Sequence, residues 1–431
     1  MKKIKMGLVF LLFIVSVLSG CSSKEGAGES EDGVVTLKIM SVSQTEQPDG
    51  ELEQKIADEY MKQNPKVKIE FIGVPMNDLY KKLTTLATSN DLPDAFTMTP
   101  EFMRTAHDMG MTANLTELLG EEYLKDFYEN IIDEASINGE LQLIPWNATP
   151  QALIFRGDWF EEEGLEAPKT WDEFIEVAQK LTKDKDGDGQ VDQWGFGLVG
   201  TRNGSGASRF IPILRSFGAA EIRKDNNGNW ITDLGSDEAK KAFQLYGDLN
   251  NKYKVVPPGV TESGFPEVAS LFATNKVAMM ITGPNALGAI YAENPDLKGK
   301  VYSTPVPKDI EYSSNFGLIG YGISENSEHK EEVADYLKFL VNKENSLQWN
   351  KDTGRLPTRK DVGESQQLNT PEMAGYSEAI TYAFHLPEIS SYSQFQDIIA
   401  EAYQTMLTNS ESVENIVKKA ENRAEDLISK E

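Results

Sequence analysis

An acidic loop at 184–192 carries carboxylates at the spacing of a metal-binding loop. Gly187 stands at position 6 of an EF-hand-like pattern, where a sharp turn is needed, and Gln190 at position 7 would supply its backbone carbonyl. The bidentate Glu of position 12 is missing, because Gly195 stands there. The spacing predicts a structural Ca²⁺ site in the weak, millimolar range, and the alternative is an acidic turn without metal. The carboxylates are Asp184 at position 1, Asp186 at position 3, Asp188 at position 5 and Asp192 at position 9.

Cys21 is the only cysteine in 431 residues and indicates a second kind of chemistry, acylation. It follows three N-terminal lysines and an apolar run too short to span a bilayer, which together are typical of an export signal. The segment Leu18-Ser19-Gly20-Cys21 resembles the lipobox of bacterial lipoproteins. We therefore predict a signal peptide at 1–20, an acyl lipid anchor such as palmitate on Cys21, and a flexible tether at 21–33. The alternative is a secretory signal with a chance cysteine.

The charge of the chain limits its partners. It has 68 Asp and Glu against 42 Lys and Arg, a net charge of −26, which becomes −29 without the three lysines of residues 1–20. Such a balance argues against nucleic acid, and against a polyanionic ligand unless a basic pocket is set into the protein. Since a single cysteine allows no internal disulfide, stability must come from a buried core, which about 400 residues can supply as two domains.

Predicted strands and helices alternate from residue 34 onward. Their order implies right-handed crossovers and a parallel sheet, whose ligands bind beyond the carboxyl ends of the strands, near 43–49 and 99–102. The predicted elements of this first α/β unit are a strand at 34–42, a helix from 52 to 64, a strand at 67–74, a helix at 77–89 and a strand at 95–98.

A second unit begins near Pro145. Thr170 followed by Glu173 forms the pattern of a capping box, and an apolar stripe follows it at helical spacing. The predicted elements of this part are strands at 152–155, 277–282 and 318–323, helices at 158–163, 170–181 and 331–341, and further helices in the last sixty residues.

Several motifs, in this order and spacing, resemble the family 1 extracellular solute-binding proteins, the carbohydrate receptors of bacterial ABC importers, which are related to maltose-binding protein. The motifs after the lipobox are Gly139-Glu140-Leu141-Gln142-Leu143-Ile144-Pro145, Ala152-Leu153-Ile154-Phe155-Arg156, Pro168-Lys169-Thr170-Trp171-Asp172-Glu173-Phe174, Ala278-Met279-Met280-Ile281-Thr282-Gly283-Pro284 and Gly354-Arg355-Leu356-Pro357-Thr358.

This resemblance implies an α/β, two-lobed periplasmic-binding-protein-like fold of the class II type, in which each lobe is a mostly parallel sheet flanked by helices. Hinge crossovers are expected near 146–149, 303–305 and 342–348. The N-terminal lobe would then comprise 34–147 and 306–346, and the C-terminal lobe 148–305 and 347–431.

The resemblance also implies function. A sugar or oligosaccharide would bind in the interlobe cleft, hinge closure would trap it, and the closed receptor would dock on the membrane permease of an ABC transporter. The protein would be a monomer without enzymatic activity, held by its lipid anchor on the cell membrane and facing outside the cytoplasm.

Sugar capture needs an aromatic ring for the apolar face of a pyranose and polar side chains for its hydroxyl rim. Trp146 and Asn147 at the first crossing lead the candidates, although Trp146 could merely pack the hinge. Asn285 follows Gly283-Pro284, where relatives commonly carry a stacking tryptophan, so a hydroxyl contact is expected there. Tyr321 lies in a Gly-rich strand where the family often has an aromatic, with ordinary core as the alternative. The remaining candidates are Gln44, Glu46, Glu101, Arg202, Asn203, Trp349 and Arg355, of which the charged ones could be solvated surface residues.

Relatives with a similar acidic loop close it with an acid directly after position 9, so the resemblance implies Gln193 as a weak further calcium ligand. Neutral oligosaccharides are expected as cargo rather than uronic acids, with which Arg202, Arg209 and Arg355 could pair.

Two other functions remain open. A sugar sensor feeding a signalling kinase would differ only in its partner. A surface glycosidase would need two carboxylates, but the sequence offers no Gly-x-Ser-x-Gly elbow and no Walker A loop, and its three histidines are scattered.

Overall fold

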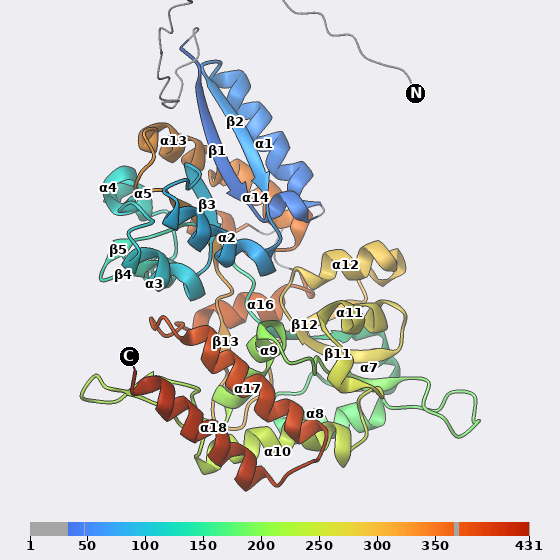
Figure 1. Ribbon diagram of the computed structural model, residues 1–431. Coiled ribbons are helices and arrows are strands. Elements are labelled where there is room, and N and C mark those ends of the chain that lie inside the picture. Colours follow the sequence, from blue (N-terminus) through green and yellow to red (C-terminus); the bar gives the residue numbers. More distant parts are fainter. Residues whose placement is uncertain (1–32, 47, 366–369, 431) are drawn as a thin grey trace, which may run out of the picture.

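The computed structural model describes residues 33–46, 48–365 and 370–430, and two lobes are visible in it (Figure 1). The first lobe, above in Figure 1, is built on a five-stranded sheet, and the second, below, on a four-stranded sheet. The predicted signal peptide, Cys21 and nearly all of the tether lie outside the described residues. Within those ranges, none of the helices combines the length and the apolar character that a membrane span requires.

In the first sheet the strand order is β2-β1-β3-β14-β6. β1 pairs in parallel with β2 and β3, whereas β14 runs antiparallel to both of its neighbours, so β6 runs in the same direction as β1 and β3. The bounds are β1 Val35–Ser41, β2 Val67–Gly73, β3 Ala95–Met98, β6 Ile144–Asn147 and β14 Ile319–Ile323.

In the second sheet the order is β12-β7-β11-β8, and β7 alone runs against the other strands. In each sheet all strands but one run in the same direction, as expected of mostly parallel sheets, but four of the seven pairings between neighbouring strands are antiparallel, so both sheets are mixed. The bounds are β7 Ala152–Arg156, β8 Trp194–Gly197, β11 Val277–Thr282 and β12 Val301–Thr304. Three short pairs complete the strands: β4 Ser136–Ile137 with β5 Glu140–Leu141, β9 Arg223–Lys224 with β10 Trp230–Ile231, and β13 Ser314–Asn315 with β15 Ala383–Phe384.

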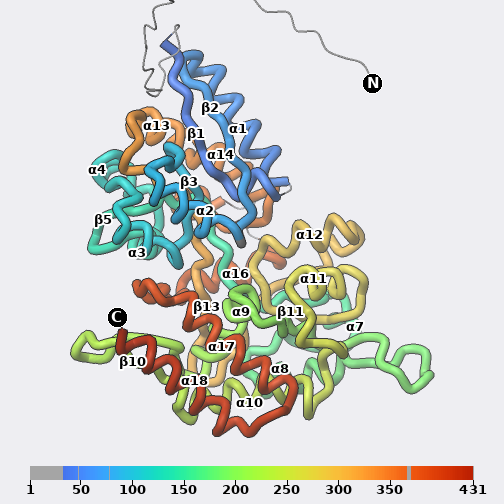
Figure 2. Tube along the Cα trace, viewed as in Figure 1, coloured from blue at the N-terminus to red at the C-terminus, as the bar shows by residue number. Residues whose placement is uncertain are grey.

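Helices flank both sheets, as the trace in Figure 2 also shows. Those of the first lobe are α1 Asp49–Gln63, α2 Met76–Thr88, α3 Pro100–Asp108, α4 Leu115–Leu119, α5 Glu121–Leu124, α6 Glu129–Glu134, α13 Lys330–Leu340, α14 Lys343–Thr353 and α15 Lys360–Gly363. Those of the second lobe are α7 Gly157–Glu163, α8 Trp171–Lys180, α9 Gly204–Ser216, α10 Asp237–Asn251, α11 Phe265–Ala273, α12 Ala286–Glu293, α16 Ala374–Ala379, α17 Tyr392–Leu407 and α18 Val413–Ile428. Short 3₁₀ turns are η1 Ser43–Thr45, η2 Val260–Glu262, η3 Pro295–Leu297 and η5 Ile380–Tyr382.

Local sequence signals explain why these elements form. Thr170 and Glu173 make the predicted capping box at the start of α8, in which the hydroxyl of Thr170 accepts a bond from the Glu173 amide. β11 is buried along its whole length because helices cover both faces of its sheet, which explains its uninterrupted apolar run. Met280 faces one hydrophobic core, and Met279 and Ile281 face the other, in the two-residue period of a strand.

The carboxyl edges of the two sheets face each other. β6 ends at Asn147 and β7 begins at Ala152, so only residues 148–151 join the carboxyl end of one to the amino end of the other. Because β7 runs against its neighbours, that amino end lies at the edge where β8, β11 and β12 terminate. Ligands of such sheets bind at this edge.

The second crossing lies later than predicted. Val306 belongs to the core of the second lobe, and the Lys308 and Ile310 amides donate to carbonyls of that lobe. The chain therefore reaches β14 of the first lobe through residues 311–318, not through 303–305.

The third predicted crossing, at 342–348, and the lobe boundary at 347 are wrong. α14 packs against α1 and α13, and Arg359 is paired with Asp126 of the first lobe. Residues 347–363 thus stay on the first lobe, and the chain returns to the second lobe before α16, which packs on β7 and β12. The physical reason is the apolar contact of Trp349 with Trp146, which holds α14 to the first lobe.

Candidate functional site

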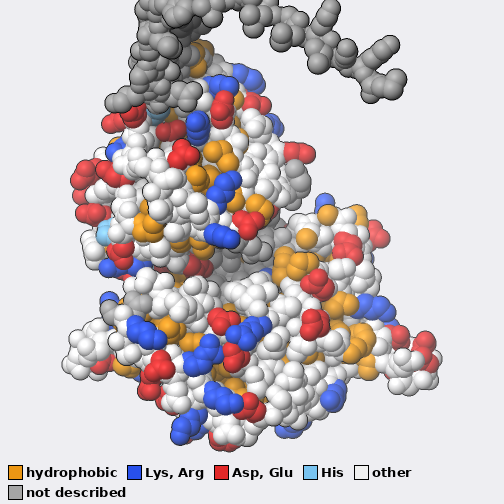
Figure 3. Space-filling model, in the orientation of Figure 1, with side chains coloured by type: hydrophobic (Ala, Val, Ile, Leu, Met, Phe, Trp, Pro, Cys, Tyr) orange, Lys and Arg blue, Asp and Glu red, His pale blue; other side chains and the backbone are white. Residues whose placement is uncertain are grey.

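Two tryptophans from distant parts of the chain pack together where the first lobe meets the second. Trp146 in β6 and Trp349 in α14 have ring centroids 4.6 Å apart at an interplanar angle of 43°. Both side chains are about 1% exposed. The next segment, Gly354–Arg355, abuts the loop after β11, since a Cβ on Gly354 would lie 3.4 Å from the carbonyl oxygen of Pro284. The surface is visibly indented between the lobes (Figure 3).

Buried polar atoms without a partner gather around this pair. We call Trp146, Asn147, Trp349, Asn350 and Arg355 the interlobe polar cluster. In the part of the chain that the structure describes, no hydrogen-bond partner exists for either indole Nε1, for the side-chain oxygen and nitrogen of either asparagine, or for Nε of the arginine. Buried polar groups are nearly always satisfied by protein, water or ligand. These five residues are at most 7% exposed, so the atoms named are buried donors and acceptors that the described residues leave unsatisfied.

Arg355 joins this cluster to the loop after β1. Its Nη2 donates to Glu46 Oε2 at 3.0 Å, and its Nη1 forms an ion pair with buried Asp49 at the start of α1. Burial lowers the pKa of Arg355, and Glu46 opposes that shift. The guanidinium carbon lies 5.9 Å from the Trp349 ring centroid. Of the predicted site residues, contacts thus link Glu46, Trp146, Trp349 and Arg355, and Asn147 follows Trp146 in β6.

Tyr321 and Gln44 belong instead to a satisfied network around Glu53 in α1. The Tyr321 hydroxyl donates to Glu53 and lies 2.8 Å from Ser41 Oγ, and Gln44 Nε2 donates to Glu53 Oε2 at 2.7 Å. Burial raises the pKa of Glu53. Tyr321 is 1% exposed, and its hydroxyl is already hydrogen-bonded within the protein. The geometry therefore favours the alternative interpretation, in which Tyr321 is a core residue. Gln44 also lines a groove of about 650 Å³ along α1, together with Trp349.

The other predicted contacts have structural partners or lie on the surface. Glu101 is bonded to Thr99 at the start of α3, and burial raises its pKa. Asn285 is exposed after β11. Arg202 forms ion pairs with Asp397 and Glu401 on the exterior of the second lobe. Asn203 caps α9 by accepting from the Gly206 amide at 2.9 Å.

Sequence reasoning missed Asn350, the fifth member of the interlobe polar cluster. A signal for it was present, because Trp349-Asn350 repeats the dipeptide Trp146-Asn147. Asp49 and Glu53 were missed as well, since both lie in a helix where acids are ordinarily solvated.

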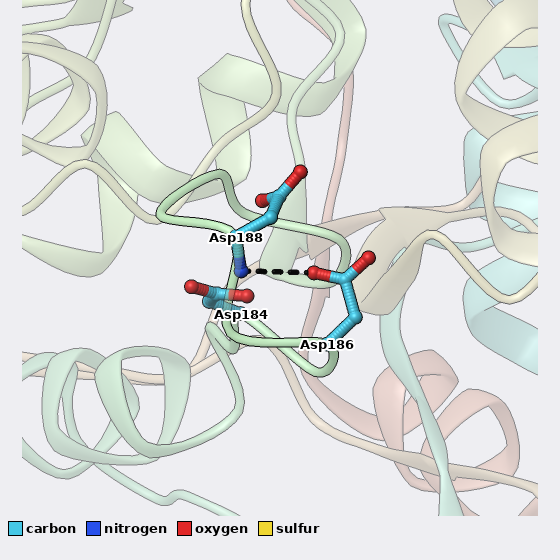
Figure 4. Close-up of side chains that lie close together, drawn as sticks. All are labelled: Asp184, Asp186 and Asp188. Carbon is cyan, nitrogen blue, oxygen red and sulfur yellow. Dashed lines mark hydrogen bonds between the residues drawn. The ribbon is translucent and has the colours of Figure 1, made fainter.

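The acidic loop brings three of its predicted ligands together. Carboxylate oxygens of Asp184, Asp186 and Asp188 lie within 4.8 Å of one another and are exposed. Figure 4 shows the three side chains around one turn, in which the Asp188 amide donates to Asp186 Oδ1 at 3.1 Å. Hydrogen bonds from the backbone amides of Gly189 and Gly187 lower the pKa of Asp184. Gly187 has φ +77°, a conformation that suits glycine.

The other predicted ligands of this loop are placed differently. Asp192 accepts from the Lys185 amide at 2.8 Å, and the Gln190 amide donates to Asp188 Oδ1 at 2.8 Å. Gln193 is buried and donates from Nε2 to the Leu181 carbonyl at 2.7 Å, so its side-chain amide is used inside the lobe.

The two lobes, the facing sheet edges and the polar cluster between them define a protein that holds a small molecule between lobes. Residues 44–346 match the family model described as bacterial extracellular solute-binding protein. The chain belongs to this family, as its motifs predicted.

Relatives and solved structures agree with that assignment. The chain is 24% identical over 345 residues to the multiple sugar-binding protein of Streptococcus mutans, a match covering 78% of each chain. It is similar to the maltose-bound MalE3 of T. maritima, with 25% identity, a TM-score of 0.78, and 91% of this chain and 99% of that one covered. An ABC transporter solute-binding protein of Thermotoga lettingae, solved with α-D-tagatose, has a TM-score of 0.80 at 24% identity, with 92% and 99% covered.

Proposed function

We propose that this protein captures a sugar or oligosaccharide between its lobes and delivers it to the membrane permease of an ABC importer. The observation that carries the proposal is the interlobe polar cluster, in which a tryptophan pair is flanked by two asparagines and an arginine with unpartnered polar atoms. A sugar can supply hydrogen-bond partners for these polar groups, because its hydroxyls both donate and accept hydrogen bonds. Its apolar C–H face can also pack on indole rings.

The comparisons support a carbohydrate as the solute. The relative in Streptococcus mutans is named a multiple sugar-binding protein, and the T. maritima structure holds maltose. Capture would require no chemical conversion, and a glycan recovered unchanged after incubation would separate this protein from a glycosidase.

A melting-temperature screen tests the proposal. The soluble form starting at Ser22 would be heated with a panel of neutral and acidic oligosaccharides. Ligand that binds only the folded state stabilises it by RT ln(1 + [L]/Kd), about 2.7 kcal/mol at a hundredfold excess over Kd. A rise of several degrees with one glycan class is expected, and no rise with any glycan would contradict the proposal.

We further propose that the acidic loop binds Ca²⁺ as a structural ion. The support is the approach of the three carboxylates within 4.8 Å and the hard oxygen chemistry of that donor set, which suits calcium. Asp184, Asp186 and Asp188 would hold the ion, and Gln190, Asp192 and Gln193 stay the predicted further ligands. The bond from Gln193 to the Leu181 carbonyl uses Nε2, so its Oε1 would be the atom that binds the ion.

The sequence around Cys21 supports a lipid anchor that holds a monomeric receptor at the cell membrane, outside the cytoplasm. Labelling of cells with a palmitate analogue should mark the wild-type protein and not Cys21→Ala, and the variant should leave the membrane fraction. Light scattering of the soluble form should give the mass of one chain. Uptake of the identified glycan that depends on this protein would favour import over sensing.

A further inference from the structure

Arg209 differs from the other arginines of the chain. The sequence has nine arginines, and eight of them form ion pairs with Asp or Glu among the described residues. Arg209 forms none, although acids outnumber bases in this protein. The paired arginines are Arg104, Arg156, Arg202, Arg215, Arg223, Arg355, Arg359 and Arg423.

The unpaired guanidinium is also buried. Arg209 is 8% exposed, and its guanidinium carbon lies 4.7 Å from the centroid of the Phe265 ring. Nη1 donates to the carbonyl oxygen and to Oγ of Ser205, both at 2.8 Å. Nη2 reaches Thr282 Oγ1 only at 3.4 Å, and Nε has no partner in the part of the chain that the structure describes. Burial lowers the pKa of Arg209 to about 10, so it stays charged at neutral pH.

The edge of the Arg209 guanidinium formed by Nε and Nη2 is the edge with which other arginines of this protein bind a carboxylate. Nε and Nη2 of Arg215 bond the two oxygens of Glu221 at 3.0 and 2.8 Å. Arg223 holds Asp233 through the same two atoms at 2.7 and 2.8 Å. A planar guanidinium edge matches a carboxylate with two parallel hydrogen bonds.

Arg209 lies at the edge of the second lobe that faces the first. Thr282 is the last residue of β11, so the guanidinium sits at the carboxyl end of the second sheet. α9, which carries Arg209, contacts β13, and Figure 1 shows α9 on the side of the lower lobe nearer the upper one. Gln151 and Asn315 on the connecting segments also have buried side-chain oxygens without a partner among the described residues.

We propose that Arg209 recognises a carboxylate of the bound sugar, so that the cargo is a glycan containing uronic acid rather than a neutral one. The inference rests on the proposed function and reverses the preference for neutral sugars that the sequence suggested. An unpaired buried cation is unfavourable in the empty protein, and a ligand carboxylate compensates it on binding. The protein has a net charge of −26, which disfavours a polyanion as ligand. Because Arg209 is a single buried cation, it suits a ligand with isolated carboxylates.

Calorimetric titration of the soluble wild-type protein with matched oligosaccharides tests the inference. Each pair has one linkage and length, and differs only in a C6 carboxylate in place of the hydroxymethyl group, as in galacturonic and galactose trisaccharides. We expect the acidic member of one pair to bind at least tenfold more tightly. Equal or tighter binding of the neutral members, or of sulfated counterparts, would overturn the inference alone. Binding of no member of any pair would overturn the proposed function, and the inference with it.

The second part of the test compares two variants, Arg209→Gln and its matched control Arg202→Gln. Arg202 lies on the same segment and is paired with Asp397 and Glu401 at the surface. Arg209→Gln should weaken binding of the acidic glycan at least tenfold and leave the neutral glycan within twofold, whereas Arg202→Gln should change neither. Retention of acidic-glycan affinity in folded Arg209→Gln would overturn the inference.

The melting temperature of the empty protein separates this role from a structural one. Because Arg209→Gln removes an unpaired buried charge, its melting temperature without ligand should be no lower than that of the wild type. A lower melting temperature together with unchanged glycan selectivity would show that Arg209 only supports the fold.

Discussion

His385 and Glu134 join the two lobes through a half-buried side-chain contact. His385 Nδ1 lies 2.8 Å from Glu134 Oε2, although 251 positions separate the two residues. Glu134 ends α6 of the first lobe, whereas His385 follows β15, whose Phe384 packs on the core of the second lobe. The carboxyl group is buried and the imidazole is half exposed. Asn130, also in α6, donates to the Ile380 carbonyl at 3.3 Å and reinforces the same contact between lobes.

This pair should make the stability of the protein depend on pH. Burial raises the pKa of Glu134 from 4.5 to about 7, and the hydrogen bond to Glu134 raises the pKa of His385 above 6.5. Both groups bind protons more tightly in the folded state, so the free energy of unfolding should fall as pH rises from about 5 to 8. The melting temperature should therefore also fall over this pH range. In Glu134→Gln the fall should be about 2–4 °C smaller, which is the shift that roughly 1 kcal/mol produces in large domains.

Glu129→Gln is the control for that measurement, because Glu129 is an exposed acid in α6, the helix that also carries Glu134. Its melting temperature should follow the wild-type pH profile. An unchanged profile in Glu134→Gln would show that the pair does not titrate in this range.

The two asparagines of the interlobe polar cluster should matter for binding and not for folding. Neither side chain has a partner in the empty protein, so Asn147→Ala and Asn350→Ala should leave the melting temperature unchanged or slightly raised. Each should weaken glycan binding about tenfold, which corresponds to a lost hydrogen bond of about 1.4 kcal/mol. Calorimetric titration measures the affinity.

Asn342→Ala serves as the matched control for the asparagines. Asn342 caps α14 by accepting from the Asn345 amide at 2.8 Å, so its loss should cost about 1 kcal/mol of stability and leave affinity unchanged. Wild-type affinity in both cluster variants would remove the cluster from the binding site.

Tyr321→Phe should destabilise the protein and spare binding. Removing the hydroxyl deprives Glu53 and Ser41 of a buried partner, which costs about 1–3 kcal/mol. Tyr253→Phe is the control, since the Tyr253 hydroxyl accepts a long bond of 3.4 Å from exposed Lys252. Urea unfolding gives the stability. A large loss of glycan affinity without a loss of stability would return Tyr321 to the binding site.

Calcium should raise the melting temperature of the protein in the millimolar range, and a chelator should reverse the rise. Asp184→Asn should weaken this response because it removes a charged oxygen donor from the group of three carboxylates. Asp225→Asn is the control: Asp225 also accepts backbone amides in an exposed turn, from Asn227 at 2.8 Å and Asn229 at 2.9 Å. An equal response in Asp184→Asn and the wild type would contradict the calcium proposal.

Local elements were predictable from sequence because their causes are local. The strand at 95–98 and the strand at 277–282 have the bounds that their apolar runs indicated. The capping box at Thr170 forms as expected, since both of its partners lie within one helical turn. The family motifs extended these elements into a two-lobed α/β fold, which the structure and the family match confirm.

Which residues lie in the candidate site depends on contacts between distant segments, and no local sequence pattern indicates these contacts. Tyr321 and Trp349 were both aromatic candidates, yet one is bonded to Glu53 and the other packs beside Trp146 with an unpartnered nitrogen. The course of the chain after residue 342 was misjudged for the same reason, because the contact of Trp349 keeps α14 on the first lobe.

The alternation of strand and helix at 34–98, the family, the acidic loop and the segment that resembles a lipobox could be inferred from the sequence, since hydrophobic period, turn residues and motif spacing are properties of neighbouring positions. Which polar groups are buried without a partner, such as Nε of Arg209 and the side-chain amide of Asn350, follows from the tertiary structure. Burial and pairing arise from segments hundreds of residues apart, so the free energy of each charged or polar group is set by neighbours that the linear sequence does not identify.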